Sequence, residues 1–139
     1  MNAATDVARP SPSMVFSMEM SADQLVQRLV AARGHIALNR LRNGRLTRSE
    51  EARVARAMDD VERMNIFIDD TGALNPRDLA ARARKAKIEH GIRLIVVDYL
   101  QLMRGNNERE GREQQVSECS RSLKALAKEL QLPIVALSQ

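Results

Sequence analysis

The chain has 139 residues, the length of one domain, and 44% of them are hydrophobic, which excludes a chain that is disordered throughout. Aromatic residues make up only 2%, so we expect an aliphatic core and no aromatic platform on which single-stranded bases could stack. The single cysteine excludes an internal disulfide, and no apolar run is long enough to cross a membrane. These features predict a cytoplasmic protein without a membrane partner.

The positive charge of the chain is concentrated between Arg28 and Arg56. The formal net charge is +4, and this segment alone holds eight arginines against two acids, Glu50 and Glu51. Such an excess could serve a phosphate backbone or an acidic partner subunit. A solvated helical surface is the alternative, and the sequence leaves both open. The eight arginines stand at positions 28, 33, 40, 42, 45, 48, 53 and 56.

The first half of the chain predicts two strands and three helices after a leader. Both longer helices open on a capping box, in which Gln24 or Glu50 reaches back to the hydroxyl residue three positions earlier. The elements are expected as a disordered leader over 1–12, a strand over 13–17, a helix from Ser21 to Gly34, a short helix over 38–42, a helix from Thr47 to about Met64, and a strand over 65–70. The inward face of the longest helix is predicted to hold Val54, Ala57, Met58 and Val61.

The second half alternates helices and strands. The elements are expected as a helix from Asn75-Pro76 to Gly91, a strand over 94–98, a glycine- and charge-rich loop over 104–112, a helix over 113–130, and a strand over 134–137. Cys119 lies on the apolar face of the last helix, which favours a core position over a nucleophile. This alternation predicts an α/β fold with a parallel sheet.

The most informative segment is the apolar run Leu94–Val97, which ends abruptly in Asp98. The run is too short for a helix and is typical of a strand buried on both faces. Open parallel sheets bind ligands just beyond the carboxyl ends of their strands. Nucleotide hydrolases place the aspartate that organises Mg²⁺ there, in the Walker B arrangement. A buried strand followed by an ordinary aspartate turn is the alternative.

Polar groups follow the other predicted strands as well. Glu19 comes just past the first strand, Asp69 and Asp70 end the second, and Gln139 follows the last. Because parallel strands end at one edge, we expect these groups to gather beside Asp98. Each group also has a simpler interpretation. Glu19 could complement a helix dipole, Gln139 could be only the last residue, and turn chemistry is favoured for the Asp pair.

Four segments carry a resemblance to a known family. They are Phe16–Ser21 (FSMEMS), Asp98–Met103 (DYLQLM), Ser120–Leu130 (SRSLKALAKEL) and Ala136–Gln139 (ALSQ). In this order and spacing, over residues 13–139, they resemble the C-terminal RecA-like motor domain of DnaB-type replicative DNA helicases. The resemblance implies a RecA-like three-layer fold with a mostly parallel central sheet. It also implies that the chain is a truncated version of that domain.

The resemblance implies roles for single residues. Glu19 matches the catalytic carboxylate that polarises the attacking water, and Asp98 matches the Walker B aspartate that positions Mg²⁺. Gln139 matches the glutamine that links the γ-phosphate state to the DNA-binding loops. A loop facing the central, DNA-binding channel of a hexameric ring is implied for the charge-rich segment that holds Arg104, Arg109 and Arg112. The implied cofactors are ATP and Mg²⁺, and the implied partners are single-stranded DNA, identical subunits, primase and a helicase loader.

One motif of this family is missing. No G-x-x-x-x-G-K-[ST] phosphate loop (Walker A) occurs in the 139 residues, and the leader stands where the family carries it. The family's arginine finger would also lie beyond Gln139. We therefore expect a fragment that, isolated, neither hydrolyses ATP nor unwinds DNA. The last strand should also lack its Walker A neighbour, which leaves an apolar edge prone to self-association.

Two other interpretations are open. The chain could be a non-enzymatic module that docks onto an intact helicase ring through its basic segment, Arg28 to Arg56. A different RecA-like ATPase is disfavoured, because DYLQLM occurs together with SRSLKALAKEL.

Overall fold

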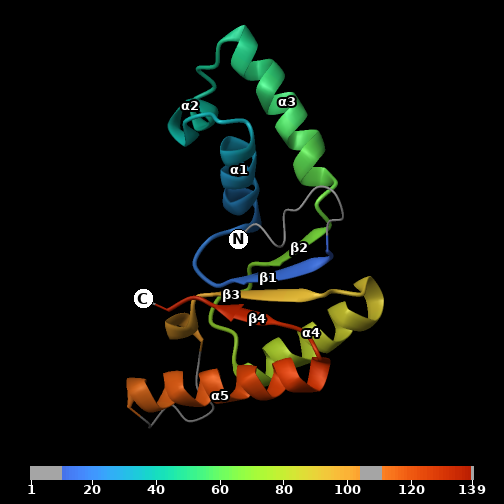
Figure 1. Ribbon diagram of the computed structural model, residues 1–139. Helices are drawn as coiled ribbons and strands as arrows, with labels where there is room; N and C mark the ends of the chain where they lie inside the picture. Colours follow the sequence, from blue (N-terminus) through green and yellow to red (C-terminus); the bar gives the residue numbers. More distant parts are fainter. Residues whose placement is uncertain (1–10, 104–110, 139) are drawn as a thin grey trace.

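The computed structural model describes residues 11–103 and 111–138, which form a central sheet with helices on both sides (Figure 1). The strands within these residues are β1 (Ser13–Ser17), β2 (Ile66–Asp69), β3 (Leu94–Asp98) and β4 (Ile134–Ala136). The helices are α1 (Ala22–Arg33), α2 (Leu38–Arg42), α3 (Arg48–Glu62), α4 (Pro76–His90), the 3-10 turn η2 (Leu100–Leu102) and α5 (Arg112–Leu130). All pairings are parallel, in the order β2-β1-β3-β4, which confirms the predicted parallel α/β fold.

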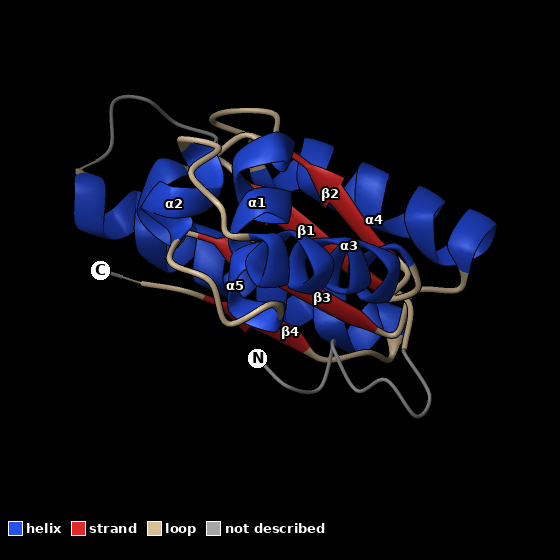
Figure 2. Ribbon diagram, turned by 90° about the horizontal axis from the view of Figure 1, so that it is seen from above, coloured by secondary structure: helices blue, strands red, loops and turns tan. Residues whose placement is uncertain are grey.

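The sheet separates two helical layers. Helices α4 and α5 lie against one face, and α1, α2 and α3 rise from the other (Figures 1 and 2). The main core lies under α4 and α5, where aliphatic side chains of the strands meet the inner faces of both helices. Its fully buried members include Phe16, Ile95, Leu79 and Cys119. The three-layer arrangement and the core position of Cys119 are therefore as predicted.

Local sequence signals define most helix ends. Both predicted capping boxes are present, at Ser21 before α1 and at Thr47 before α3. Helix α4 begins with Asn75 as N-cap and Pro76 in its first turn, and it ends at Gly91. Gly91 has a φ of 62°, a left-handed conformation that a residue without a Cβ adopts at low cost. These signals are local, and for that reason the sequence could reveal them.

Four boundaries or orientations differ from the sequence prediction. Strand β2 is shorter at both ends, β4 ends at Ala136 instead of Leu137, and α5 begins at Arg112, which places that arginine in a helix and not in the loop. The prediction for Met58 is wrong, because its side chain is 57% exposed. Helix α3 rises from the sheet, and this part of it faces an open cavity instead of a packed core.

Three predictions fall on residues outside the described ranges: the disorder of the leader over 1–10, the channel-facing loop with Arg104 and Arg109, and the place of Gln139. Within the described residues, no helix combines the length and the apolarity that crossing a membrane requires.

Candidate active site at the carboxyl ends of the strands

The two central strands bring the candidate carboxylates to the same edge of the sheet. Ser17 at the end of β1 is paired with Asp98 at the end of β3, and the Met18 amide donates to the Asp98 carbonyl over 2.9 Å. Glu19 follows two residues after Ser17, in the turn that leads to α1. The structure therefore places Glu19 and Asp98 at neighbouring strand ends, as the sequence predicted.

Both carboxylates are unengaged. Glu19 is exposed and Asp98 is half-buried, and neither side chain has a hydrogen bond or ion pair with another described residue. Such groups are accessible to water and to a ligand. A structural acid, by contrast, would be expected to hold a partner.

The donor set fits part of a Mg²⁺ site. In phosphate-transferring enzymes this ion is usually held by one or two carboxylates together with substrate phosphates and water. The free carboxylate of Asp98 fits such a role. No group of three or more His, Cys, Asp or Glu residues within the described ranges could hold a metal without other ligands. The residues present therefore suit an ion that arrives with a phosphate ligand.

The acids at the end of β2 have structural partners instead. Asp69 pairs with Arg82 at 2.6 Å and accepts from the Thr71 amide at 3.0 Å. Burial opposes ionisation of Asp69, but hydrogen bonds from Arg82 and Thr71 outweigh it and hold the pKa of the carboxyl below its usual value. Asp70 accepts from the Ala22 amide at 2.9 Å, across 48 residues of sequence. Turn chemistry describes Asp69, whereas no local signal could have revealed the contact of Asp70 with the start of α1.

The ends of β3 and β4 are also joined beyond the sheet. The Leu100 amide donates to the Leu137 carbonyl over 2.9 Å, and the Gln101 side-chain amide donates to the Ser138 hydroxyl over 2.8 Å. These bonds place Ser138 beside the segment that follows Asp98. Of the three candidate DNA-facing arginines, only Arg112 is described, and it is exposed in the first turn of α5.

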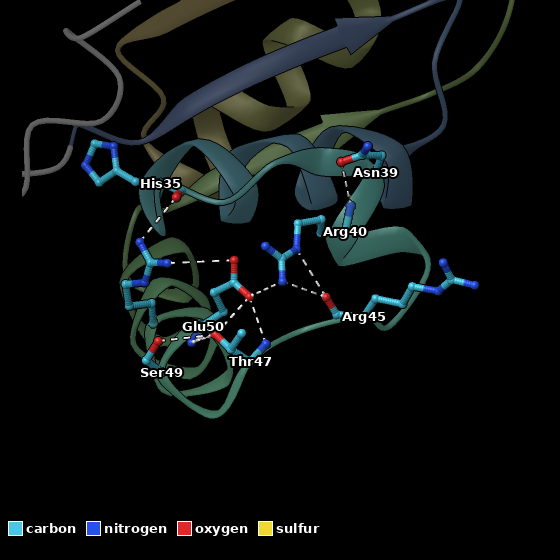
Figure 3. Close-up of polar contacts among 8 residues, drawn as sticks. His35, Asn39, Arg40, Arg45, Thr47, Ser49 and Glu50 are labelled. Carbon is cyan, nitrogen blue, oxygen red and sulfur yellow. Dashed lines mark hydrogen bonds and ion pairs between the residues drawn. The ribbon is translucent and has the colours of Figure 1, made fainter.

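The basic segment is partly neutralised inside its own lobe (Figure 3). Glu50 is only 8% exposed and pairs with Arg40 at 2.9 Å and with Arg53 at 4.0 Å. The Arg40 guanidinium also donates to the Arg45 carbonyl, at 3.2 Å. A hydrogen bond from the Thr47 amide lowers the pKa of Glu50, burial opposes this, and the Thr47 hydroxyl, Arg40 and Arg53 lower it further. Part of the charge excess therefore braces α2 against α3.

Cys119 has no features of a nucleophile. It is fully buried under α5, and burial raises the pKa of its thiol, which keeps the sulfur protonated. This agrees with the core position that the sequence favoured.

The sheet order and the strand-end carboxylates define a RecA-like ATPase fold. Two solved structures share it: the ATPase domain of another protein, with a TM-score of 0.89 and 27% identity, and a DnaB-like replicative helicase studied with primase, with a TM-score of 0.88 and 27% identity. Each superposition covers 97% of this chain, but only 48% and 33% of the respective neighbour.

The sequence comparison gives the family. The DnaB-like helicase C-terminal domain matches residues 1–139, and the chain belongs to this family. It is 46% identical over 142 residues to the replicative DNA helicase DnaB of Geobacillus stearothermophilus, and 44% identical over 127 residues to that of Mycobacterium leprae. The alignments cover 100% and 91% of this chain, but only 31% and 21% of those relatives. The chain thus corresponds to part of a replicative helicase.

The family match begins at residue 1 and so includes residues 1–12, which the sequence analysis set apart as a leader. The disorder of that leader stays a prediction, because residues 1–10 lie outside the described part of the chain.

Proposed function

We propose that this chain supplies the water-activating and metal-organising part of the ATPase site in a replicative DNA helicase motor. The observation that supports the proposal most is the pair of unengaged carboxylates at adjacent strand ends, Glu19 and Asp98. Family membership gives this arrangement its chemical context.

The roles follow from position. Glu19 lies on a turn beyond the sheet, where its carboxylate can accept a proton from a water molecule and orient its oxygen towards a γ-phosphate. Asp98 ends the central strand β3, where its carboxylate can hold Mg²⁺ directly or through water. The ion, when bound, neutralises the charge that develops on the phosphate oxygens. Gln139 follows Ser138 and is proposed to sense the phosphate, and Arg112 is proposed to face DNA together with Arg104 and Arg109.

ATP binding requires residues that this sequence does not contain. The 139 residues hold no glycine-rich loop ending in Lys-Ser or Lys-Thr, so the amides and the lysine that cradle the phosphates must come from elsewhere. We therefore propose that the chain alone neither hydrolyses ATP nor unwinds DNA. Single-stranded DNA, identical subunits of a hexameric ring, primase and a helicase loader are proposed as partners of the whole protein, in the cytoplasm.

Two measurements test this proposal. The isolated chain should show no Mg²⁺-dependent ATP hydrolysis. A hybrid in which this chain replaces the matching 142 residues of the G. stearothermophilus helicase should hydrolyse ATP and unwind DNA. In that hybrid, Glu19→Gln and Asp98→Asn should each reduce turnover by about 10²–10⁴-fold.

Glu51→Gln serves as the matched control, since Glu51 is an exposed acid in the first turn of α3. This variant should keep the activity of the unchanged hybrid. A Glu19→Gln hybrid as active as the unchanged one would contradict the role of Glu19. ATP hydrolysis by the isolated chain that disappears in Glu19→Ala would contradict the proposed dependence on outside residues.

The alternative, a non-enzymatic module that docks onto an intact ring, finds support in the open edge of the sheet. Within the described strands β4 pairs only with β3, and Val135 and Leu137 are 44% and 41% exposed. Co-purification of the chain with an intact helicase ring, together with an inactive hybrid, would favour this module.

A further inference from the structure

Ser17 is a buried polar residue next to the candidate site, and the proposed function gives it no role. It is the last residue of β1, pairs with Asp98, and is only 1% exposed. A buried hydroxyl is costly unless it is hydrogen-bonded, so its partners indicate what it does.

Both hydrogen bonds of the Ser17 hydroxyl go to one residue three positions later. The hydroxyl donates to the Met20 carbonyl over 2.7 Å and accepts from the Met20 amide over 3.3 Å. The side chain therefore closes the segment Ser17–Met20 into a turn from the inside. Glu19 lies within this turn, immediately before the residue that Ser17 holds.

The flanks of the turn are anchored independently. On one side the Met18 amide donates to the Asp98 carbonyl. On the other side Ser21 begins α1 with its capping box, and Asp70 accepts from the Ala22 amide. Only the middle of the turn depends on Ser17. The backbone of Glu19 is thus held in place while its carboxylate remains free of partners among the described residues.

We propose that Ser17 is a positioning residue, which fixes the Glu19 carboxylate relative to Asp98 by closing the turn between them. This inference rests on the proposed function, in which Glu19 orients the attacking water. A reacting group held in place avoids the entropic cost of finding its geometry, and a displacement of about 1 Å can reduce turnover by about 10²-fold. Ser17 would therefore act on catalysis without touching the substrate.

The same strand offers a matched control. Ser13, at the other end of β1, is 0% exposed, and its hydroxyl also donates to a backbone carbonyl, that of Ser11, over 2.8 Å. Ser13→Ala and Ser17→Ala remove the same group from the same strand, and only the second change opens the Glu19 turn. Any general effect of losing a buried hydroxyl should appear in both variants.

Amide hydrogen exchange in the 139-residue chain provides the first test. Ser17→Ala should increase exchange at the Met20 amide at least about tenfold and leave the amides of β3 unchanged, because only the local turn opens. Ser13→Ala should leave Met20 as protected as in the unchanged chain. Equal protection of Met20 in all three chains would overturn the proposal. So would a Ser17→Ala chain that no longer folds, since the hydroxyl would then serve the whole domain.

Turnover in the hybrid helicase provides the second test. Ser17→Ala should lower kcat for ATP hydrolysis by about 10–100-fold and change KM little, whereas Ser13→Ala should change neither. Ser17→Thr restores a hydroxyl and should recover most of kcat even if its added methyl group lowers the melting temperature. Equal kcat in the alanine and threonine variants would overturn the proposal.

A Glu19→Gln hybrid separates this inference from the proposed function. If Glu19→Gln abolishes turnover but Ser17→Ala does not reduce it, Glu19 keeps its role and only the positioning role of Ser17 fails. If Glu19→Gln leaves turnover intact, the proposed function itself fails.

Discussion

The two faces of the sheet are covered to very different depths. Under α4 and α5, Phe16, Ile95 and Val97 of the strands are 0% exposed. On the opposite face, an open cavity of about 930 Å³ lies between α1, α3 and β2, and Val26 and Met58 on its walls are 40% and 57% exposed. The turn that carries Glu19 leads into α1, on this loosely covered side.

The difference suggests a division of tasks between the two layers. Tightly packed interiors resist change and account for most of the stability of a domain, whereas functional segments are usually drawn from the less stable parts. The α4–α5 layer should therefore determine whether the chain folds. The α1–α3 layer should depend on its own local contacts, namely helix caps and the ion pairs around Glu50. Three predictions test this comparison.

The largest effect is expected from a cavity in the packed layer. Leu79 in α4 is 0% exposed, so Leu79→Ala should lower the free energy of unfolding by about 2–5 kcal/mol. Met58→Ala on the open face should cost less than about 1 kcal/mol, because its side chain is already largely in water. Urea denaturation followed by circular dichroism measures both values. Similar losses in the two variants would remove the distinction between the layers.

A moderate effect is expected from the cap of α3. Thr47→Ala removes the hydroxyl that accepts from the Glu50 amide and should cost about 1 kcal/mol. Ser49→Ala is the control, because Ser49 lies in the same helical turn but is not the cap (Figure 3). It should be nearly neutral in the same denaturation experiment. Equal costs for Thr47→Ala and Ser49→Ala would mean that capping does not stabilise the α1–α3 layer.

The smallest effect is expected from acid. The pKa values of Glu50 and Asp69 are lowered in the folded chain, so each contributes stability above its unfolded pKa and loses it as the pH falls through the folded value. Stability should therefore decline below about pH 4. Glu50→Gln should make this decline shallower, as melting temperatures between pH 3 and 7 would reveal. An identical pH dependence in both chains would exclude a contribution of Glu50.

Much of the fold could be predicted because its signals are local. The boundaries of β1, β3 and α4 follow from apolar runs, a proline and a helix-ending glycine, all of which act within a few residues. The orientation of Met58 could not be predicted in the same way. Its spacing in α3 suits an inward position, but which helical face finds a partner depends on how far α3 stands from the sheet.

The candidate site divides along the same line. The sequence by itself determined which groups are present, Glu19 and Asp98 after short apolar strands, because residue type and strand-end position are local properties. Only the tertiary structure decided what holds them. It paired Ser17 with Asp98, closed the Glu19 turn through the buried Ser17 hydroxyl and joined Asp70 to the start of α1. Such contacts depend on strand register and on packing between distant segments, and the free energy that selects them comes from burial of the whole sheet.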